Sequence, residues 1–370
     1  MSGQGWLRWI GAEAPAFSTS PRFRAWAAAF PLTRPIARRR ATALFDLCAG
    51  FVYSQILSAA IALRLPETLL QAPGSAAEIG QRIGLPPEGA ARLLDAGVAL
   101  RIARRRWRDG RYTLGGLGAA LIENPGVVAM ITHHTMLYDD LRDPVALLRG
   151  ECRGTALGRY WPYSRPGAPP TRDAVSPYST LMATSQAMIR DEVLAAYDVG
   201  RHRCLLDVGG GDGSFLVSAA ARSAKLLLML FDLPAVAELA RQHLERAGLS
   251  PRAHVVGGDF HHDRLPEGAD LITLVRVLHD HDDEAALALL RAARLALQPG
   301  GRLLIAEPMS GTRGARASGD AYFGFYLMAM GSGRPRTPAR IASMLREAGF
   351  TRCRLLRTRT PLVAKLMLAS

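Results

Sequence analysis

Apolar residues in the second half of the chain follow two alternating patterns. Short, nearly continuous apolar runs are typical of buried parallel strands, and apolar residues three and four positions apart are typical of helices. The patterns alternate from Arg203 onwards, which predicts a doubly wound α/β sheet. The predicted strands are residues 204–209, 226–231, 254–257, 270–275 and 302–306, and the predicted helices are 214–222, 235–247, 283–297 and 337–348.

The end of the chain departs from this alternation. Cys353–Thr358 and Leu362–Leu368 have the pattern of two strands joined by a short turn, so this last pair is predicted to be antiparallel. A nicotinamide dehydrogenase would continue with another crossover helix. A parallel sheet closed by an antiparallel last strand is instead the class I methyltransferase variant of the fold.

The first half of the chain predicts mainly helices, followed by a hairpin. Ala41–Leu65, Ala76–Ile83 and Glu88–Leu100 are helical in pattern, and Asp109-Gly110 is a typical hairpin turn. Three helices and a hairpin predict a winged-helix domain. The predicted domains are a Trp- and Arg-rich segment with several prolines at 1–40, the winged-helix domain at 41–124, a helical connector at 125–200 that ends in a long helix from Tyr178 to Val199, and a catalytic domain at 201–370.

A winged-helix domain raises DNA binding as an alternative function. The arginines around the predicted wing, Arg104 to Arg111, are consistent with it. The third helix, however, offers few side chains that read bases, because Arg92 and Asp95 stand among alanine, leucine and valine. We therefore expect this helix to pack against another subunit, and we expect no nucleic-acid partner.

The first predicted strand of the sheet ends in a glycine cluster. The segment 205–214 reads LLDVGGGDGS, a buried strand followed by a tight turn and the start of a helix. Nicotinamide-, flavin- and S-adenosylmethionine-binding sheets all use such a loop, so the motif alone does not name the ligand. We expect Asp207, Gly209 and Gly211 to belong to a cofactor site.

Acidic residues follow the next two strands. Asp232, with Leu233 behind it, is placed to bind a ribose diol about 20 residues after the glycine loop. Asp259 is placed to accept from an adenine amino group, with Phe260 covering the ring. Each aspartate alone could be a solvated strand end, but three polar groups at successive strand ends favour one nucleoside site.

The fourth and fifth strands end in a candidate base and a carboxylate. His279 follows the fourth strand at the carboxyl edge, where such sheets bind ligands, and Glu307 ends the fifth strand beside it. A solvated loop histidine is the alternative. A histidine with a carboxylate behind it is the arrangement that general-base catalysis needs.

Charge and cysteine usage add little further chemistry. The formal net charge of +14 comes almost entirely from arginine, which indicates either a solvated arginine-rich surface or attraction to an anionic surface. The tryptophans near the N-terminus, including Trp26, could lie at a membrane interface or cover a neighbouring domain. The four cysteines lack ligand spacing, and His133-His134 and Asp139-Asp140 diverge on a helix, so no metal is expected.

No targeting or spanning segment is evident from the sequence. The pattern of a signal peptide is missing, and the apolar stretch Leu44–Leu63 contains Asp46 and Gln55, which predicts a buried or amphipathic helix. We expect a cytoplasmic protein.

The motifs together resemble a known family. LLDVGGGDG, FDLPAV, GGDF, RVLHDHDDE and LQPGGRLLIAEP, in this order, are similar to the small-molecule O-methyltransferases of the acetylserotonin and plant phenylpropanoid type. The resemblance covers about residues 41–370 and implies S-adenosyl-L-methionine as the cofactor, a homodimer, His279 as base and Glu307 as its partner. The implied cofactor residues are Asp207, Gly209, Gly211, Asp232, Leu233, Asp259, Phe260 and Arg276. Arg276 stands where the family often has lysine, and Pro335 stands where it has a second glutamate that braces the histidine.

Other segments resemble the purple-bacterial carotenoid O-methyltransferases. These include GRYTLGGLGAAL, MLYDDLRDPVALL and YFGFYLMAMGSGRPRT. The resemblance implies methylation of the tertiary 1-hydroxyl of an acyclic carotenoid, a lipophilic substrate, with peripheral contact to the inner, photosynthetic membrane. A bacteriochlorophyllide C-methyltransferase and a phenolic O-methyltransferase remain alternatives, as does a winged-helix regulator. The predicted substrate pocket comprises Tyr178, Met182, Tyr322, Phe325, Tyr326 and Met330, although an ordinary helix core explains the last four equally well.

Overall fold

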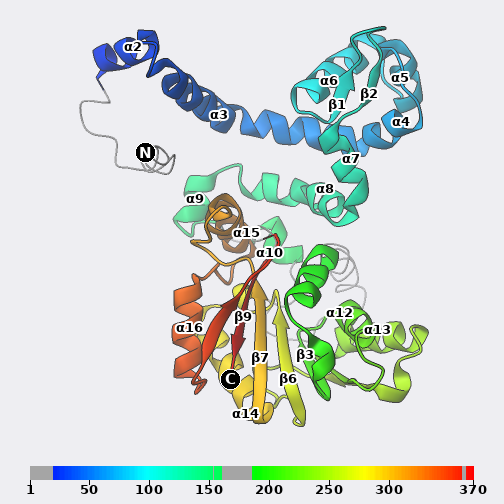
Figure 1. The fold of residues 1–370 in the computed structure, drawn as a ribbon, viewed down its shortest axis with the longest axis vertical. Helices are drawn as coiled ribbons and strands as arrows, with labels where there is room; N and C mark the ends of the chain where they lie inside the picture. The colour runs from blue at the N-terminus through cyan, green and yellow to red at the C-terminus, as the bar shows by residue number, and fades with distance from the viewer. Residues whose placement is uncertain (1–19, 153, 161–185, 361–363) are drawn as a thin grey trace. The chain divides into compact units, whose positions relative to one another are not determined.

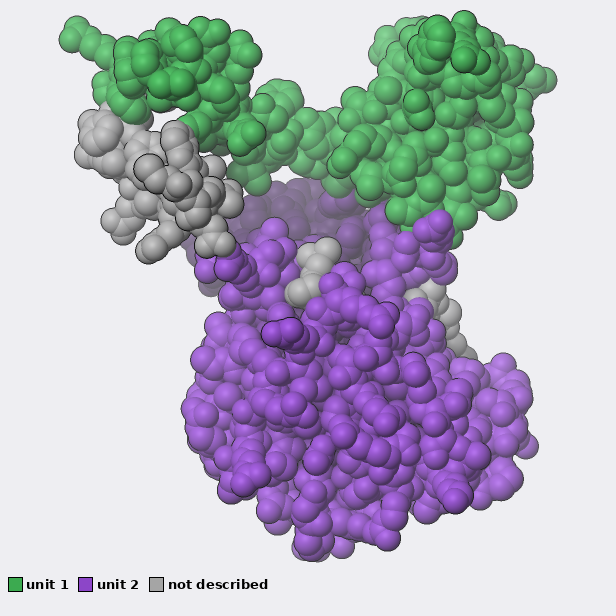
Figure 2. Space-filling view, viewed as in Figure 1, with its two compact units in different colours: residues 1–122 green, residues 123–370 purple. Residues whose placement is uncertain are grey.

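A computed structural model describes residues 20–152, 154–160, 186–360 and 364–370. The chain forms two compact units, residues 1–122 and 123–370 (Figure 2). Each unit is described by itself below. Tyr178 and Met182, predicted to line the substrate pocket, lie outside the described residues.

The larger unit is built on a seven-stranded sheet with the strand order β5-β4-β3-β6-β7-β9-β8 (Figure 1). Neighbouring strands from β5 to β7 are parallel, and β9 runs antiparallel to both β7 and β8. The predicted methyltransferase variant of the doubly wound fold is therefore confirmed. The strands are β3 (Cys204–Val208), β4 (Leu227–Asp232), β5 (Ala253–Gly257), β6 (Ala269–Val275), β7 (Leu297–Glu307), β8 (Cys353–Leu356) and β9 (Lys365–Ala369).

Helices cover both faces of this sheet, and each face has its own apolar core. One core joins the sheet to α14 and α16, and the other joins it to α12, α13 and the helical residues 186–196. The alternation of strands and helices predicted from the sequence is present, with shifts of a few residues at the ends. The helices and turns are α12 (Ser214–Ala220), α13 (Pro234–Arg246), α14 (Asp283–Ala296), α16 (Pro338–Glu347), η3 (Val199–Arg201), η4 (Ser250–Arg252) and η5 (Leu278–Asp280).

A smaller helical cluster completes this unit. Its core brings Leu137, Leu147 and Leu157 against Tyr326 and Met330. Residues 137–157, which the sequence analysis placed in a helical connector, thus share a core with residues 326–330, which follow the fifth predicted strand of the sheet. The elements are α8 (Pro125–Asp140), α9 (Pro144–Leu148), α10 (Ala156–Tyr160), the π-helical turn η6 (Ala317–Tyr322) and α15 (Phe323–Met330).

The N-terminal unit contains the predicted helices and hairpin. Strands β1 and β2 pair in antiparallel register, and Gly110 adopts a positive φ of 67° in the turn between them. Helices α5 and α6 pack beside the hairpin around a core that includes Leu94 and Tyr112. The elements are α2 (Pro21–Ala29), α3 (Arg34–Ala62), α4 (Leu65–Gln71), α5 (Ala76–Ile83), α6 (Pro87–Ala99), β1 (Ala103–Arg105), β2 (Tyr112–Leu114) and α7 (Gly116–Glu123).

Two expectations about this unit were wrong. The prolines of residues 1–40 predict that no long helix forms there, but the 29-residue α3 begins at Arg34, because Pro35 lies in its first turn, where no amide donor is needed. The single helix predicted over 41–65 instead begins at Arg34 and is interrupted after Ala62, where Arg64 has a φ of +51°. A left-handed residue cannot continue a right-handed helix, so the chain starts a new helix, α4, there.

The exposed apolar surface lies on α3 rather than on α6. The apolar residues of α6, such as Ala90 and Leu94, are buried within their own unit, which corrects the expectation that this helix packs against another subunit. In α3, by contrast, Leu47 is 82% exposed and Phe51 is 71% exposed. By length and composition α3 is also the one described helix that is apolar enough to cross a membrane.

Candidate active site

The glycine loop after β3 makes a close turn against two neighbouring strands. The Gly209 amide donates to the Phe231 carbonyl at 2.8 Å, and its φ is +69°. A Cβ at Gly209 would stand 2.6 Å from the Val277 side chain, so only glycine fits there. Gly211 also has a positive φ, but no atom of the described residues lies within 4 Å of the place where its Cβ would stand. The loop therefore leaves room for a ligand beside Gly211.

Asp232 joins this loop to the end of β4. Its carboxylate accepts from the amides of Gly211, at 2.8 Å, and Leu233, at 2.7 Å. Burial raises the pKa of Asp232 to about 6, although both amide hydrogen bonds act to lower it. Each carboxylate oxygen can still accept a second donor, because it has two lone pairs.

Asp207 lies one residue before the end of β3 and is buried. It accepts a hydrogen bond from the Thr273 hydroxyl at 2.6 Å. Burial, with a further contribution from the charge of Asp232, raises its pKa to about 7. Asp207 thus supports the base of the glycine loop, where a Cβ on Gly210 would stand 2.8 Å from its Oδ2.

The remaining predicted cofactor residues lie at the same edge of the sheet. Asp259 and Phe260 follow β5; Asp259 accepts from the His261 amide at 2.9 Å, and the Phe260 ring meets the His281 ring edge-on at 5.0 Å. Arg276 follows β6 with a φ of +57°, and its guanidinium lies over the ring of Phe323.

The predicted base and its partner are in contact. His279 Nδ1 contacts Glu307 Oε2, and both side chains are buried. The other carboxylate oxygen, Oε1, accepts from the amides of Val277 at 3.1 Å and Leu278 at 2.7 Å. Glu307 therefore holds both the imidazole and the backbone that leads to it. Because the Glu307 carboxylate accepts from Nδ1–H, Nε2 is the ring nitrogen that can take up or release a proton.

The sequence analysis missed a second carboxylate at this histidine. Asp280 Oδ1 lies 3.2 Å from His279 Nε2. The carboxylate beside Nε2 thus comes from the residue that follows the histidine in the turn. The sequence analysis assigned no role to Asp280, which directly follows the histidine in HDHDDE.

The groups around His279 shift its pKa in opposite directions. Burial alone would lower the pKa of His279, but the carboxylates of Asp280 and Glu307 outweigh it and raise the pKa above the ordinary 6.5. Burial raises the pKa of Asp280 to about 6, against the opposing effect of His279. A proton taken up at Nε2 would therefore be stabilised on both sides of the ring.

An aromatic cluster continues from this histidine. Phe323 meets the His279 ring at 5.9 Å and lies beside Tyr322 and Tyr326. The Tyr322 hydroxyl is paired with His134 at 2.7 Å and the Tyr326 hydroxyl with His133 at 3.1 Å. Of the predicted pocket residues, Tyr326 and Met330 are buried in the helical core, and Tyr322 and Phe325 are half-buried against it.

The two histidines of α8 are thus engaged by tyrosines. Burial lowers the pKa of His133 to about 4, so it pairs with Tyr326 as a neutral ring. Asp140 accepts from the amides of Ala156 and Leu157. Across the described residues, no three His, Cys, Asp or Glu side chains are grouped to hold a metal ion.

Comparison with known families decides the class of this site. An O-methyltransferase domain matches residues 138–351, and an O-methyltransferase dimerisation domain matches residues 45–124. The chain belongs to the O-methyltransferase family. The enzyme is 43% identical to demethylspheroidene O-methyltransferase of Cereibacter sphaeroides over 95% of this chain and 92% of that protein. It is 41% identical to the protein of the same name from Rhodobacter capsulatus, over 91% and 84% of the two chains.

Solved structures support the same class. The crystal structure of the S-adenosylmethionine-dependent methyltransferase SibL in its apo form has a TM-score of 0.73 and 26% identity, covering 89% of this chain and 98% of that one. The enzyme is an S-adenosylmethionine-dependent O-methyltransferase, and its dimerisation domain indicates a homodimer. Part of the matched dimerisation domain is α3, whose apolar side chains are exposed in the single chain.

The glycine loop fits S-adenosylmethionine in its shape and its polar groups. The open side of Gly211 gives a ligand access to the backbone, and the half-engaged carboxylate of Asp232 beside it can accept two further hydroxyl donors. Both features match a ribose that carries neighbouring hydroxyls.

Proposed function

We propose that this O-methyltransferase methylates the hydroxyl of a lipophilic acceptor of the acyclic carotenoid class, with His279 as general base. The observation that carries the proposal is the buried contact between His279 Nδ1 and Glu307. A base that is oriented by a carboxylate is the arrangement that proton removal from an alcohol requires.

In the proposed mechanism Glu307 keeps the Nδ1 proton in place, so Nε2 of the neutral ring is the nitrogen that would accept the hydroxyl proton. Asp232, Leu233 and the backbone of Gly209 and Gly211 would hold the cofactor, with Asp259 and Phe260 at its adenine end. When bound, S-adenosylmethionine supplies an electrophilic methyl group. His279 takes the hydroxyl proton as the oxygen attacks, because a tertiary alcohol is too weak an acid to ionise first. The Asp280 carboxylate, 3.2 Å from Nε2, stabilises the resulting imidazolium.

Two observations support a carotenoid acceptor. The relatives that match over most of the chain are named for demethylspheroidene. The aromatic cluster beside His279 also pairs both of its tyrosine hydroxyls with histidines, which leaves mainly ring faces for an acceptor. A surface made mainly of aromatic rings favours an apolar chain over a hydroxylated ring.

The substrate assignment can be tested with labelled S-adenosylmethionine. Hydroxylated acyclic carotenoids, simple phenols and a bacteriochlorophyllide are supplied in parallel, each in detergent micelles. We expect label in a carotenoid methyl ether at a rate at least tenfold above the other acceptors. Label found only in a phenol ether, or on a bacteriochlorophyllide carbon, would reject the carotenoid while retaining methyl transfer. His279→Ala serves as the background control.

We further propose that α2 contacts an anionic membrane, where such acceptors dissolve. On this helix Trp26 lies beside Phe23 and stacks on Phe30, the residue after its last turn, and Trp26 is 51% exposed. The arginine-rich start of α3, Arg34 to Arg40, follows directly. Aromatic rings beside basic residues are typical of peptides that lie in a lipid interface.

The membrane contact predicts a change in vesicle binding. The variant Trp26→Ala/Phe30→Ala should lower co-sedimentation with phosphatidylglycerol vesicles severalfold and leave the thermal midpoint unchanged. Leu295→Ala is the matched control, since Leu295 is 83% exposed and lies on α14. Equal co-sedimentation of the double variant and the control would contradict the proposal.

A further inference from the structure

The turn that carries His279 is held on its carbonyl side by one short segment. Four successive carbonyls, those of Leu278, His279, Asp280 and His281, accept hydrogen bonds from residues 332–336, which we call the strap. The donors are Arg336 Nη1 to Leu278 at 2.7 Å, the Arg334 amide to His279 at 2.9 Å, the Ser332 hydroxyl to Asp280 at 3.0 Å and Arg336 Nη2 to His281 at 2.6 Å.

The backbone of the strap lies in close contact with the backbone of this turn at Gly333. Gly333 has a φ of +82°, and a Cβ there would stand 2.2 Å from the His279 carbonyl oxygen. The Gly333 amide also donates to Asp282 at 3.2 Å. A residue with a side chain would push the strap off the turn, so glycine is required at this position.

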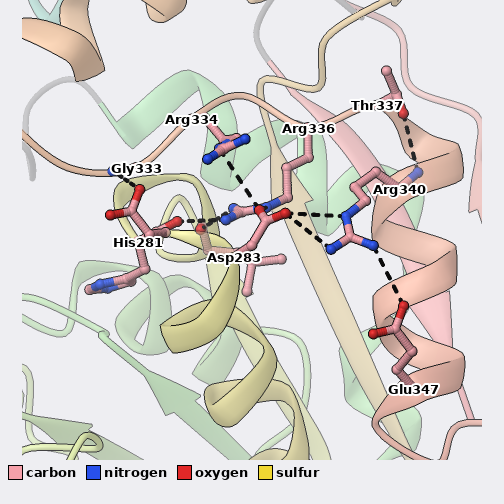
Figure 3. Close-up of polar contacts among 10 residues, drawn as sticks. His281, Asp283, Gly333, Arg334, Arg336, Thr337, Arg340 and Glu347 are labelled. Atoms are coloured by element: carbon pink, nitrogen blue, oxygen red, sulfur yellow. Dashed lines mark hydrogen bonds and ion pairs between the residues drawn. The ribbon is translucent and has the colours of Figure 1, made fainter.

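Arg336 is the centre of the strap. Its side chain is 2% exposed, and its third nitrogen, Nε, binds Asp283 Oδ1 at 2.8 Å. Figure 3 shows the guanidinium between Asp283 and His281, with Arg340 bound to the other carboxylate oxygen of Asp283. A buried charge is thus neutralised and all three guanidinium nitrogens are engaged, which is the condition for a rigid fork.

The backbone of Arg336 also contacts the exit from β7. Its carbonyl accepts from the Ser310 amide at 3.0 Å, three residues after Glu307. Arg336 therefore joins the two chain segments that carry His279 and Glu307. Its side chain binds the His279 turn, and its main chain binds the segment after Glu307.

We propose that Arg336 is a positioning residue for the methyl transfer, which holds His279 in line between Glu307 and Asp280 through the carbonyls of Leu278 and His281. The inference rests on the proposed role of His279 as base. Arg336 itself touches neither the imidazole nor the acceptor. Displacement of a base by about 1 Å costs up to 10²-fold in rate, so a strap that fixes the turn has a direct kinetic consequence.

The test compares three substitutions in the full-length enzyme. Arg336→Met removes the fork and keeps an apolar stem, while Asp283 retains Arg340 as a partner. Arg336→Lys keeps the charge and can bind one carbonyl at a time. Arg340→Met is the matched control, because Arg340 shares the Asp283 carboxylate, is 43% exposed and makes no bond to the turn.

The expected results separate positioning from stability and binding. Arg336→Met should lower kcat about 10- to 100-fold with KM within threefold, Arg336→Lys should recover part of the loss, and Arg340→Met should stay within twofold. The charged groups facing the His279 ring are Glu307, Asp280 and Arg276. In Arg336→Met, His279 should contact the carboxylates of Glu307 and Asp280 more loosely, which lowers its pKa. The acid limb of the kcat profile should therefore move to lower pH.

Several outcomes would overturn the proposal. One is a kcat of Arg336→Met within twofold of the wild type. Another is a loss of kcat in Arg340→Met equal to that in Arg336→Met. The third is a rise in KM that accounts for the whole loss of kcat/KM in Arg336→Met, with the acid limb of the pH profile unchanged. If Arg336→Met does not fold, Ser332→Ala replaces it and should lower kcat severalfold with the same pH shift; no change would overturn the proposal. The ¹⁵N titration of His279 is read in parallel. If Arg336→Met lowers the pKa of His279 but the wild type transfers no methyl group, the positioning role of the strap would be supported and the proposed function rejected.

Discussion

His279→Ala is expected to lower methyl transfer by about 10² to 10⁴-fold, the range for removal of a general base. Its affinity for S-adenosylhomocysteine should stay within about twofold, because the imidazole contacts Glu307 and Asp280 rather than the glycine loop. Single-turnover assays measure the rate, and calorimetry measures the affinity. Because the carboxylates raise the pKa of His279 above 6.5, the wild-type rate should fall on the acid side from a midpoint above that value.

The control for this variant is His279→Gln, which keeps a polar side chain near Glu307 but cannot take up a proton. It should be as inactive as His279→Ala. A glutamine variant that retains most of the activity would assign the histidine a structural role and leave the base unidentified.

Asp232→Asn should weaken S-adenosylhomocysteine binding about 30-fold at pH 7.5, roughly 2 kcal/mol for the loss of charged hydrogen bonds to the ribose. The wild type should itself bind more weakly in acid. Burial raises the pKa of the free Asp232 to about 6, whereas hydroxyl donors favour the ionised form, so binding releases a proton below that pH. The dissociation constant should then rise up to about tenfold per pH unit below 6.

The amide variant should lack this acid dependence. Asp207→Asn is the comparison, since Asp207 titrates nearby with a pKa of about 7 and hydrogen-bonds Thr273. If the acid dependence is lost in Asp207→Asn and retained in Asp232→Asn, the ribose contact has been assigned to the wrong aspartate. Calorimetry between pH 5 and pH 8 distinguishes the two cases.

The sheet could be predicted from the sequence because its strands are buried on both faces. Continuous apolar runs such as 204–208 and 269–275 stand out, and the residues that end them fall at one edge of a parallel sheet by geometry alone. This is why Asp232, His279 and Glu307 were found without a structure. The antiparallel last strand followed equally from the short connection before it.

The contacts of the turn that carries His279 could not be predicted in the same way. Asp280 reaches Nε2 only because a single 3-10 turn directs two adjacent side chains to one place, and Arg336 is separated from its carbonyl partners by more than 50 residues. Neither contact leaves a periodic pattern. Likewise the burial of Tyr326 and Met330 depends on α8 and α10, whose packing on α15 has no signature in the aromatic run itself.

If the homodimer covers the open face of α3, the stability of each subunit depends on the protein concentration. A chain that leaves Leu47 and Phe51 in water gains free energy when a second copy covers them, and that gain follows mass action. The melting temperature of this O-methyltransferase should then fall as the protein is diluted.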